Sequence, residues 1–585
     1  MSLRYVAILV RAGSAPENDI ARLTTVFGSP PIISADGTIV FANDAKHITI
    51  SDFGRCICLG RIFTTGDRPA PVKGFDDDDL RKLSDAGEYF YKRYWGGYVA
   101  IVRKHLDSIE VVRDPSGGMP CYLIERDSLL IVASDVGVLV DAKILKPSVN
   151  FREAARQFQH VGLRGAATAI EGLNEIRAGF SLVAGGSHYR SIEQRWKPWQ
   201  YCSPMIARSD QELQEQLRST ISACVNALAS EFQHVLLTLS GGLDSSIVAA
   251  CLAKNHQAVT CLTLTSPGSE GDERAEAASV AQHLGLRLIV DRLRVEDFDL
   301  QQSSAAHLPR PVGSPLRRAF DEACLRAGHA VGAIAHFNGN GGDNVFAFSR
   351  STAAVLDQIA VGASYSEIWK TVLNISRLSK ESAYKVLMHA ARARLKRNAT
   401  TKQHGQTRFL NPEVIEDHDE CGNEWLAAPK KLLPGQTAHI SKLLTPQNYI
   451  EGFGRGDAAE LVTPLLAQPV MELCLSVPSW LWCAGGLDRA QARAAFSDAL
   501  PPPTVARTAK GGPTGFFYAV LESSRSEIRE HLLDGCLMSA GLLDRNAIEL
   551  FFQGEPLTTP ADDAIRILEL ADSESWARGW RNRLV

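Results

Sequence analysis

Ser240-Gly241-Gly242-Leu243-Asp244-Ser245-Ser246 stands between an apolar run, His234 to Leu239, and a helical pattern from Ser245 to Ala253. The two glycines let the backbone come close to a ligand, and amide groups at the start of a helix point toward anionic oxygens. We therefore expect Leu239 to Gly242, with Ser245 and Ser246, to hold a pyrophosphate group, and Asp244 to offer a carboxylate to Mg²⁺. The lysine-containing spacing of a Walker loop is absent. The alternative interpretation is a glycine-rich turn with a helix cap.

Strands and helices alternate after this loop. Apolar runs at Val259 to Thr265, Arg287 to Val290 and Val331 to Phe337 are separated by helical patterns at Ala275 to Leu284 and Leu316 to Ala327. This order predicts a parallel, doubly wound sheet whose ligand site lies at the carboxyl ends of the strands. Thr265, at the end of one such strand, is expected to belong to the same site. Beyond residue 350 the pattern is mostly helical.

A second glycine-rich loop follows the last of these strands. It reads Phe337-Asn338-Gly339-Asn340-Gly341-Gly342-Asp343-Asn344-Val345-Phe346. Gly339 and Gly341 are expected to admit the same ligand, and Asp343 to be the second carboxylate of one Mg²⁺ site, because this ion prefers one or two carboxylates with phosphate oxygens. Taken alone, the loop is equally well a turn capped by Asp343.

Composition limits the class of protein. A chain of 585 residues predicts two or more domains, and 45% hydrophobic with 22% charged residues is typical of a globular protein. The net charge of −4 argues against a nucleic-acid partner. No apolar run is long enough to span a bilayer, so we expect no membrane partner, and Tyr5 to Val10 is predicted to be a strand rather than a signal peptide. Twelve cysteines without paired spacing predict free thiols in a reducing cytoplasm.

The N-terminal part differs from the rest of the chain. Short apolar segments at 98–102, 109–112, 121–124 and 129–133 predict a mainly antiparallel, layered sheet. A boundary is expected near residues 195–208, followed by a helix capped by Ser209 or Asp210. We therefore predict two domains, 1–203 and 204–585. The acidic run Asp76 to Asp79 is interpreted as a solvated helix start.

These motifs together resemble a known family. The Ser240 loop, Gly271-Asp272-Glu273 and the Asp343 loop occur in the order seen in asparagine synthetase and β-lactam synthetase. Similar closing segments stand at Arg489 to Phe496, Leu500-Pro501, Arg507 and Lys510-Gly511-Gly512. The N-terminal half resembles the family's glutaminase-like domain at Trp95-Gly96-Gly97-Tyr98, Arg113-Asp114-Pro115-Ser116-Gly117 and Glu171-Gly172-Leu173.

The resemblance implies a fold and a chemistry. It implies an α+β glutaminase-like (Ntn-type) domain and an α/β ATP pyrophosphatase domain of the adenine nucleotide α-hydrolase-like type. MgATP would adenylate a carboxylate, which an amine then attacks to form an amide. Asp244 and Asp343 would hold Mg²⁺, and Lys510 would act at the acyl phosphate and the developing oxyanion. A solvated surface lysine is the alternative for Lys510.

One difference from the family's pattern distinguishes among its members. Glutamine-dependent asparagine synthetases need a cysteine after the initiator methionine, whereas this sequence has Ser2 and its first cysteine is Cys56. We therefore expect an inactive glutamine amidotransferase-like domain and an amine carried by the substrate itself. The Gly341-Gly342-Asp343-Asn344 loop, with Asn340 where β-lactam synthetases carry tyrosine, looks most like lasso peptide cyclases.

The predicted substrate is therefore a leader-less precursor peptide, and the pathway would include a leader peptidase and a leader-binding protein. The alternatives are a small-molecule cyclase of the β-lactam synthetase kind and an ammonia-dependent asparagine synthetase. A base for the amine is not evident, because Asn338 and Asn340 cannot accept a proton and His336 lies in an apolar strand. Arg317 and Arg318 could meet a phosphate or a carboxylate, or form a solvated helix face.

Overall fold

The structure is a computed structural model of the chain. It describes residues 3–10, 16–35, 37–51, 55–76, 80, 86–105, 108–126, 129–160, 162–185, 189–202, 209–255, 258–266, 271–395, 406–415, 423–427, 432–452, 460–509, 511–554 and 560–583. Five residues named in the sequence predictions lie outside the described residues: Ser2, Asp77 to Asp79 and Lys510.

Two antiparallel sheets of six strands each form the N-terminal part, as predicted. The first has the order β10 (Asn174–Glu175), β8 (Tyr122–Arg126), β9 (Leu129–Ala133), β1 (Tyr5–Val10), β3 (Thr38–Ala42) and β2 (Ile33–Ala35). The second has the order β12 (Tyr189–Gln194), β11 (Phe180–Gly185), β7 (Ser108–Arg113), β6 (Tyr94–His105), β5 (Cys56–Thr64) and β4 (Ile48–Ile50). The helices of this part are α1 (Glu17–Phe27), α3 (Ala86–Arg93), α4 (Val136–Asp141) and α5 (Phe151–Gln159).

Strand β1 shows how the layers are held together. Tyr5, Ala7 and Leu9 pack in one cluster with residues of the second sheet. Val6 and Ile8 pack in another cluster with α4 and α5. Successive side chains of a strand point to opposite faces, so an apolar strand of this kind belongs between two layers. The layered α+β arrangement is the glutaminase-like fold expected from the sequence.

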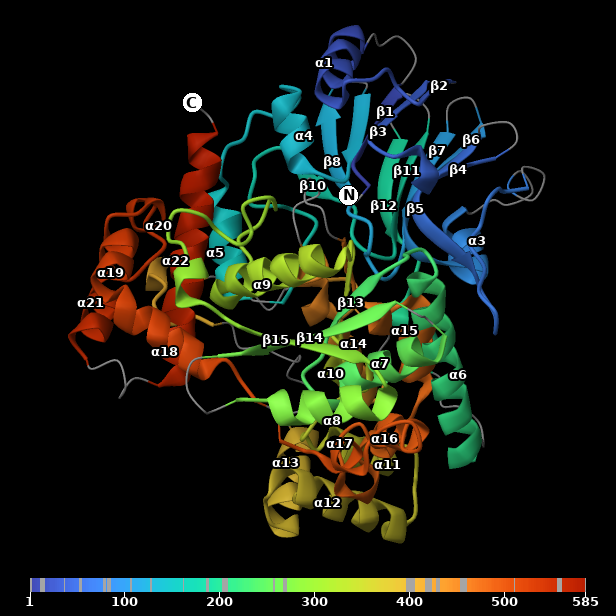
Figure 1. Ribbon diagram of the computed structural model, residues 1–585, viewed down its shortest axis with the longest axis vertical. Helices are drawn as coiled ribbons and strands as arrows, with labels where there is room; N and C mark the ends of the chain where they lie inside the picture. Colours follow the sequence, from blue (N-terminus) through green and yellow to red (C-terminus); the bar gives the residue numbers. More distant parts are fainter. Residues whose placement is uncertain are drawn as a thin grey trace.

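A parallel sheet forms the centre of the second part (Figure 1). Its order is β15 (Arg287–Arg292), β14 (Val259–Thr265), β13 (Val235–Thr238), β16 (Ala335–Phe337) and β17 (Glu460–Val462). Leu236 of β13 packs against α9 (Pro315–Val331), whereas Val235 and Leu237 pack on the side of α7 (Leu243–Asn255). This α/β fold with helices on both faces is the predicted one. The division at residues 203 and 204 stays a prediction.

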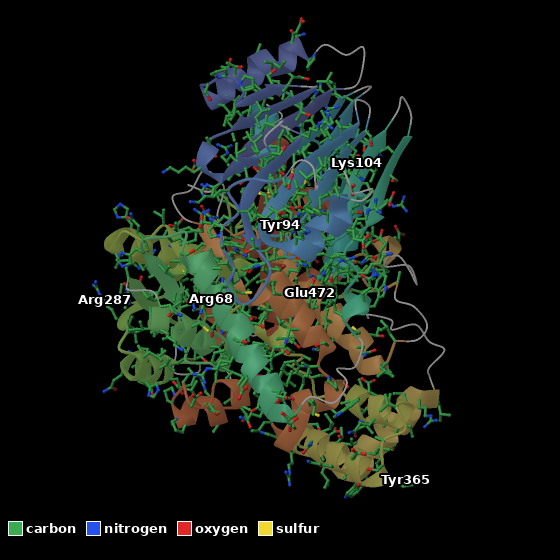
Figure 2. The ribbon with its side chains drawn as sticks, turned by 90° about the vertical axis from the view of Figure 1, so that its right-hand side faces the viewer. Arg68, Tyr94, Lys104, Arg287, Tyr365 and Glu472 are labelled. Carbon is green, nitrogen blue, oxygen red and sulfur yellow. The ribbon has the colours of Figure 1, made fainter. Side chains whose placement is uncertain are left out.

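The second part contains further helices, of which those within residues 353–395 extend away from the N-terminal sheets, whereas the last one packs against the N-terminal part (Figure 1). They are α6 (Asp210–Ala229), α8 (Arg274–Leu284), α10 (Gly342–Val345), α11 (Ala353–Ala360), α12 (Tyr365–Ser379), α13 (Ala383–Leu395), α14 (Pro434–Leu444), α15 (Gln468–Ser476), α16 (Ala490–Ala495), α17 (Pro502–Ala506), α18 (Thr514–Ser523), α19 (Arg525–Leu533), α20 (Cys536–Ser539), α21 (Arg545–Gln553) and α22 (Ala561–Asn582). In the side view, Tyr365 of α12 lies at the end of the molecule opposite the N-terminal sheets (Figure 2). Among the described residues, no helix combines the length and apolarity that crossing a bilayer requires.

Two details of the sequence prediction are wrong. Val331 ends α9 rather than beginning a strand, because Gly332 adopts a left-handed conformation and ends the helix there. Strand β17 was not predicted; it pairs in parallel with β16 through Ala335 and Glu460. The capping box at Ser209 confirms the predicted start of α6.

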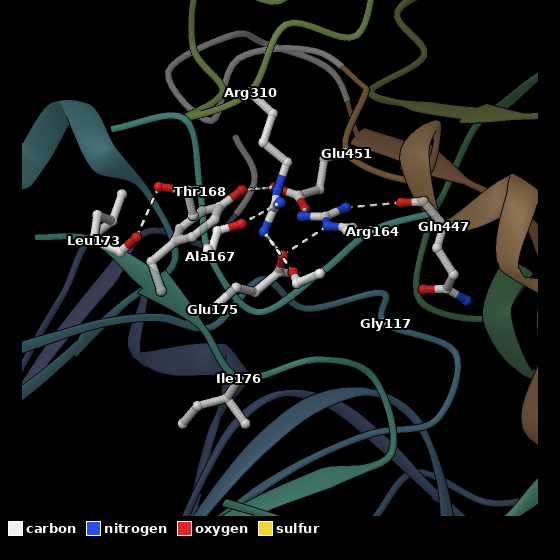
Figure 3. Close-up of polar contacts among 12 residues, drawn as sticks. Gly117, Arg164, Ala167, Thr168, Leu173, Glu175, Ile176, Arg310, Gln447 and Glu451 are labelled. Atoms are coloured by element: carbon white, nitrogen blue, oxygen red, sulfur yellow. Dashed lines mark hydrogen bonds and ion pairs between the residues drawn. The ribbon is translucent and has the colours of Figure 1, made fainter. Parts of the chain in front are cut away.

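A buried cluster of charges joins the two parts (Figure 3). Glu175 accepts hydrogen bonds from Arg164 at 2.7 Å and from Arg310 at 2.5 Å, and it also pairs with Arg113. Burial alone would raise the pKa of Glu175, but the three guanidinium groups hold it below its ordinary value. Arg164 also pairs with Glu451 and donates to the Gln447 carbonyl at 2.7 Å. The N-terminal part therefore fixes the segment 447–451.

Candidate active site

The first glycine-rich loop connects β13 to α7, as predicted. Gly241 has a φ of +69°, and a Cβ atom there would collide with the backbone of Glu276 in α8. The Ser246 hydroxyl donates to the Gly242 carbonyl at 2.8 Å, and the Gly242 amide donates to the Ser240 hydroxyl at 3.3 Å. These hydrogen bonds fix the conformation of the loop at the start of α7, where backbone amides can bind an anion.

The second loop packs directly on the first. A Cβ atom on Gly339 would lie 2.5 Å from the Ser245 amide nitrogen, and one on Gly342 would collide with the Asp244 carboxylate group. Glycine is required at Gly339 because the backbone of the first loop occupies the space that a side chain needs, and at Gly342 because the Asp244 side chain does. This close approach of the loops after β13 and β16 brings Asp244 and Asp343 together.

Both carboxylates contact a single nitrogen atom of Arg489. Its Nη1 donates to Asp244 Oδ2 at 2.9 Å and to Asp343 Oδ1 at 2.5 Å. Burial opposes the charge of Arg489, but the carboxylates of Asp244, Asp343 and Asp488 outweigh it and raise the pKa of the guanidinium. The two aspartates therefore converge on one point of positive charge, as a shared cation site requires.

The chain around Arg489 holds the guanidinium in this place. Asp488 accepts from Arg489 Nε at 2.8 Å, and the Phe348 ring lies 5.5 Å from the guanidinium carbon. The backbone of Arg489 has a φ of +52°, which is uncommon for a residue other than glycine and costs on the order of 1 kcal/mol. The sequence placed Arg489 in the family's closing segment without assigning it a role.

The chemistry of the pair suits Mg²⁺. Two carboxylates from two loops, beside a helix N-terminus, match an ion that takes one or two protein carboxylates and completes its shell with phosphate oxygens. The described residues contain no group of three or more His, Cys, Asp or Glu side chains arranged to hold a metal alone. A metal held by Asp244 and Asp343 would complete its shell with water molecules or phosphate oxygens.

Other predicted residues have definite places. Thr265 ends β14, where its hydroxyl donates to the Asp291 carbonyl at 3.4 Å, and Leu239 is buried beside β14. Glu273 accepts from Arg507 at 3.0 Å and from the Gly511 amide at 3.1 Å. Arg507 and Gly511 of the predicted closing segment thus both contact Glu273, the residue that precedes α8.

A cavity of about 440 Å³ opens beside the aspartate pair. One wall consists of the two aspartates and the Asn338 to Asn344 loop, and the other of α9 and the segment 445–450. Arg317 lines this cavity and donates a hydrogen bond from Nε to Asp321 at 3.2 Å, whereas Arg318 lies outside the lining and donates to Gln302 at 2.9 Å. Of the two arginines considered from the sequence, Arg317 therefore faces the site.

The histidine and lysine near the second loop differ in their surroundings. His336 is buried in β16, and burial lowers its pKa to about 4, which confirms the expected buried histidine. Lys442 of α14 was missed by the sequence reasoning. Burial lowers its pKa and the nearby Asp343 carboxylate opposes that shift. Lys442 is therefore a second cation close to the aspartate pair.

Comparisons with known proteins agree with this geometry. The family model described as asparagine synthase matches residues 216–578. No curated protein sequence matches the chain.

Solved structures similar to this chain include glutamine phosphoribosylpyrophosphate amidotransferase from B. subtilis, complexed with ADP and GMP. It is 10% identical, has a TM-score of 0.23 and covers 50% of this chain and 91% of its own. An NH3-dependent NAD synthetase from Campylobacter jejuni, in complex with the nitrate ion, is 16% identical, has a TM-score of 0.19 and covers 39% of this chain and 100% of its own.

The matched residues contain both glycine-rich loops, Arg489 and α9, and they make up more than half of the chain. The chain therefore belongs to the asparagine synthase family, whose members are ATP-dependent amide-forming synthetases.

Proposed function

We propose that the protein is a lasso peptide macrolactam synthetase. ATP would adenylate an Asp or Glu side chain of a leader-less peptide and release pyrophosphate. The N-terminal amine of the same peptide would then attack the acyl carbon, form the amide and release AMP. The observation that carries this proposal is the convergence of Asp244 and Asp343 at one end of a cavity that extends to α9.

Each part of the site has a task in this reaction. The amides of the Ser240 loop and the first turn of α7 would bind the β- and γ-phosphates. Asp244 and Asp343 would hold Mg²⁺, which when bound neutralises phosphate charge. Arg489 and Lys442 would add fixed positive charge where the pyrophosphate leaves, and Lys510 would stabilise the developing oxyanion.

The cavity favours a substrate that brings its own amine. Asn338 and Asn340 line it beside the aspartates, and neither amide side chain can take a proton. An α-amine has a reference pKa of about 7.7 to 8.0, so a useful fraction is neutral near neutral pH without a strong base. Folding the peptide in the cavity would bring amine and acyl carbon together and replace much of the entropy cost of a two-molecule reaction.

The cysteines offer no support for glutamine hydrolysis. Burial raises the pKa of the thiols of Cys58 and Cys261, the latter to about 12, and ten of the eleven cysteines that the structure describes are buried. A nucleophilic thiolate needs a lowered pKa and exposure. We therefore propose that the N-terminal part acts as a scaffold. Its Arg164 holds the segment 447–451 of the second part, and Tyr449 and Ile450 of that segment line the cavity.

The test is mass spectrometry of a candidate core peptide incubated with the protein and MgATP. The proposal predicts a product lighter by one water, with AMP and pyrophosphate formed in equal amounts, and no product with Asp343→Asn. The small-molecule and ammonia alternatives supply the other outcomes. AMP formed only with a small β-amino acid, or only with aspartate and ammonium, would reject the peptide and assign the corresponding alternative.

A further inference from the structure

Helices α12 and α13 form a hairpin at the end of the molecule opposite the N-terminal sheets (Figures 1 and 2). Their inner faces are well packed: Val372, Ile375 and Val386 join one cluster with Val355 of α11. Their outer faces nevertheless carry large apolar side chains in solvent. The exposed fractions are 94% for Tyr365, 49% for Trp369, 37% for Leu373, 75% for Tyr384, 40% for Leu387 and 87% for Leu395.

These side chains form rows rather than isolated exceptions. Tyr365, Trp369 and Leu373 recur every four residues along α12, and Tyr384, Leu387 and Leu395 have helical spacing along α13. Residues spaced in this way share one face of a helix. Single exposed apolar residues need no explanation, whereas a contiguous apolar face marks a surface that another body covers.

The same hairpin is basic, although the chain as a whole has a net charge of −4. Six basic residues lie between Ser364 and Leu395, at Lys370, Arg377, Lys380, Lys385, Arg392 and Arg394, against two acidic ones. Both acids are engaged, Glu367 in the capping box of α12 and Glu381 with His389 at 3.6 Å. Within the part of the chain that the structure describes, none of the six basic residues forms an ion pair.

We propose that the α12–α13 hairpin docks on an anionic membrane surface. Trp and Tyr side chains would lie at the level of the headgroups, leucines at the acyl boundary, and Lys and Arg against lipid phosphates. The charge excludes a symmetric dimer through this face, because two basic faces repel each other. Protein interfaces are depleted of lysine at their apolar centre, whereas here Lys370 follows Trp369 and Lys385 follows Tyr384 in the sequence.

A peripheral contact of this kind needs no spanning helix. The expectation of no membrane partner rested on the length of apolar runs, which bears on spanning alone. The hairpin is also on the opposite side of the parallel sheet from the N-terminal sheets (Figure 1). Docking would therefore leave the junction between the two parts of the protein facing away from the bilayer.

Flotation of the full-length protein with lipid vesicles tests this proposal. The protein is expected to float with vesicles of equal parts phosphatidylglycerol and phosphatidylcholine, and to stay behind with phosphatidylcholine alone. Added salt should weaken binding, since the lipid charge is screened. Lys385→Glu combined with Arg392→Glu should reduce binding more than about tenfold. Tyr365→Ser combined with Trp369→Ser should also weaken it at constant charge.

Matched control substitutions lie elsewhere on the surface. Leu550→Ser removes a side chain that is 69% exposed on α21, and Arg287→Glu reverses an exposed charge on β15; both should float like the unaltered protein. Circular dichroism would confirm that every variant is folded. Three outcomes overturn the proposal: no flotation with the anionic vesicles, as expected of an acidic protein partner; equal flotation with neutral vesicles; or hairpin variants that bind like the controls.

Discussion

Asp244 and Asp343, separated by about a hundred residues in the chain, share one nitrogen atom of Arg489, at 2.9 and 2.5 Å. Two carboxylates this close repel each other unless a cation lies between them. In this structure that cation is the Arg489 guanidinium. Asp244 and Asp343 would hold Mg²⁺ only once this guanidinium has left the space between them.

The first prediction concerns the two aspartates. Asp244→Asn and Asp343→Asn, made singly, should each lower Mg²⁺-dependent conversion of ATP to AMP at least a hundredfold, because each removes a metal ligand and its charge. Neither change should unfold the protein, since both side chains lie at the cavity rather than in the core. Chromatographic measurement of AMP tests this, and full turnover in either variant would remove that residue from the metal site.

Arg489 offers a second prediction, which needs no substrate. Arg489→Gln should lower the free energy of unfolding by about 1–3 kcal/mol, because it leaves two carboxylates facing each other. Mg²⁺ without nucleotide should then raise the melting temperature of this variant more than that of the unaltered protein. Arg287→Gln, on the exposed strand β15, is the control. Equal Mg²⁺ effects in all three proteins would mean that Arg489 does not compete for the metal carboxylates.

A third prediction tests the contact between the loops. Gly339→Ala should abolish AMP formation, since its Cβ would lie 2.5 Å from the Ser245 amide nitrogen and push the loops apart. Gly579→Ala in α22, where a Cβ meets open space, should have no effect beyond a slight stabilisation. Activity and unfolding are both to be measured, and an active Gly339→Ala protein would contradict the interlocked loops.

The fourth prediction concerns the buried charges at the junction. Arg310→Met should cost about 3–5 kcal/mol of stability because it leaves Glu175 with fewer partners, whereas Arg318→Met, on the outer side of α9, should change stability by less than about 0.5 kcal/mol. Denaturant unfolding at neutral pH compares the two. Similar values for both variants would show that the cluster contributes nothing to stability.

The same cluster predicts a pH dependence. The pKa of Glu175 is lowered in the folded protein, so the stability that its ionisation contributes is present above the ordinary glutamate pKa of about 4.3 and is lost as the pH falls toward the folded value. Unfolding free energies between pH 7 and pH 3 should therefore fall more steeply for the unaltered protein than for Glu175→Gln. Parallel curves would assign the acid sensitivity to other carboxylates.

Lys510 supplies a last prediction from the sequence. Lys510→Ala should leave ATP binding unchanged and stop product formation, because its charge is required only as the oxyanion develops. Calorimetric titration with ATP and a product assay separate the two effects. Unchanged product formation would assign this lysine to the surface.

The sequence predicted those parts of the molecule whose signals are local. The strand Val259–Thr265 has the predicted bounds, and the capping box at Ser209 marks the start of α6. Asp244 and Asp343, which were predicted from glycine-rich loops after apolar runs, come together in the structure on Arg489. Strand β17 was not predicted because its three residues, Glu460–Val462, are too few to show a periodic pattern. Their pairing with β16 is a tertiary contact.

The charged residues show more clearly which contacts a single sequence cannot predict. In the sequence, Glu175 and Arg310 look like any surface residues, and only the fold brings them into one buried pair. The fold likewise brings Arg489 to Asp244 and Asp343. Lys442 was not predicted for the same reason, because it stands about a hundred residues from Asp343 in the chain. Long-range charge pairing has no spacing rule in one sequence, so these contacts could not be predicted.

Diffraction from crystals soaked with Mn²⁺ and a non-hydrolysable ATP analogue tests the central claim most directly. An anomalous peak should lie within bonding distance of one carboxylate oxygen of Asp244, one of Asp343 and the analogue's phosphate oxygens, with the Arg489 guanidinium displaced from between the two aspartates. A metal bound by only one of these aspartates, or by neither, would contradict the account.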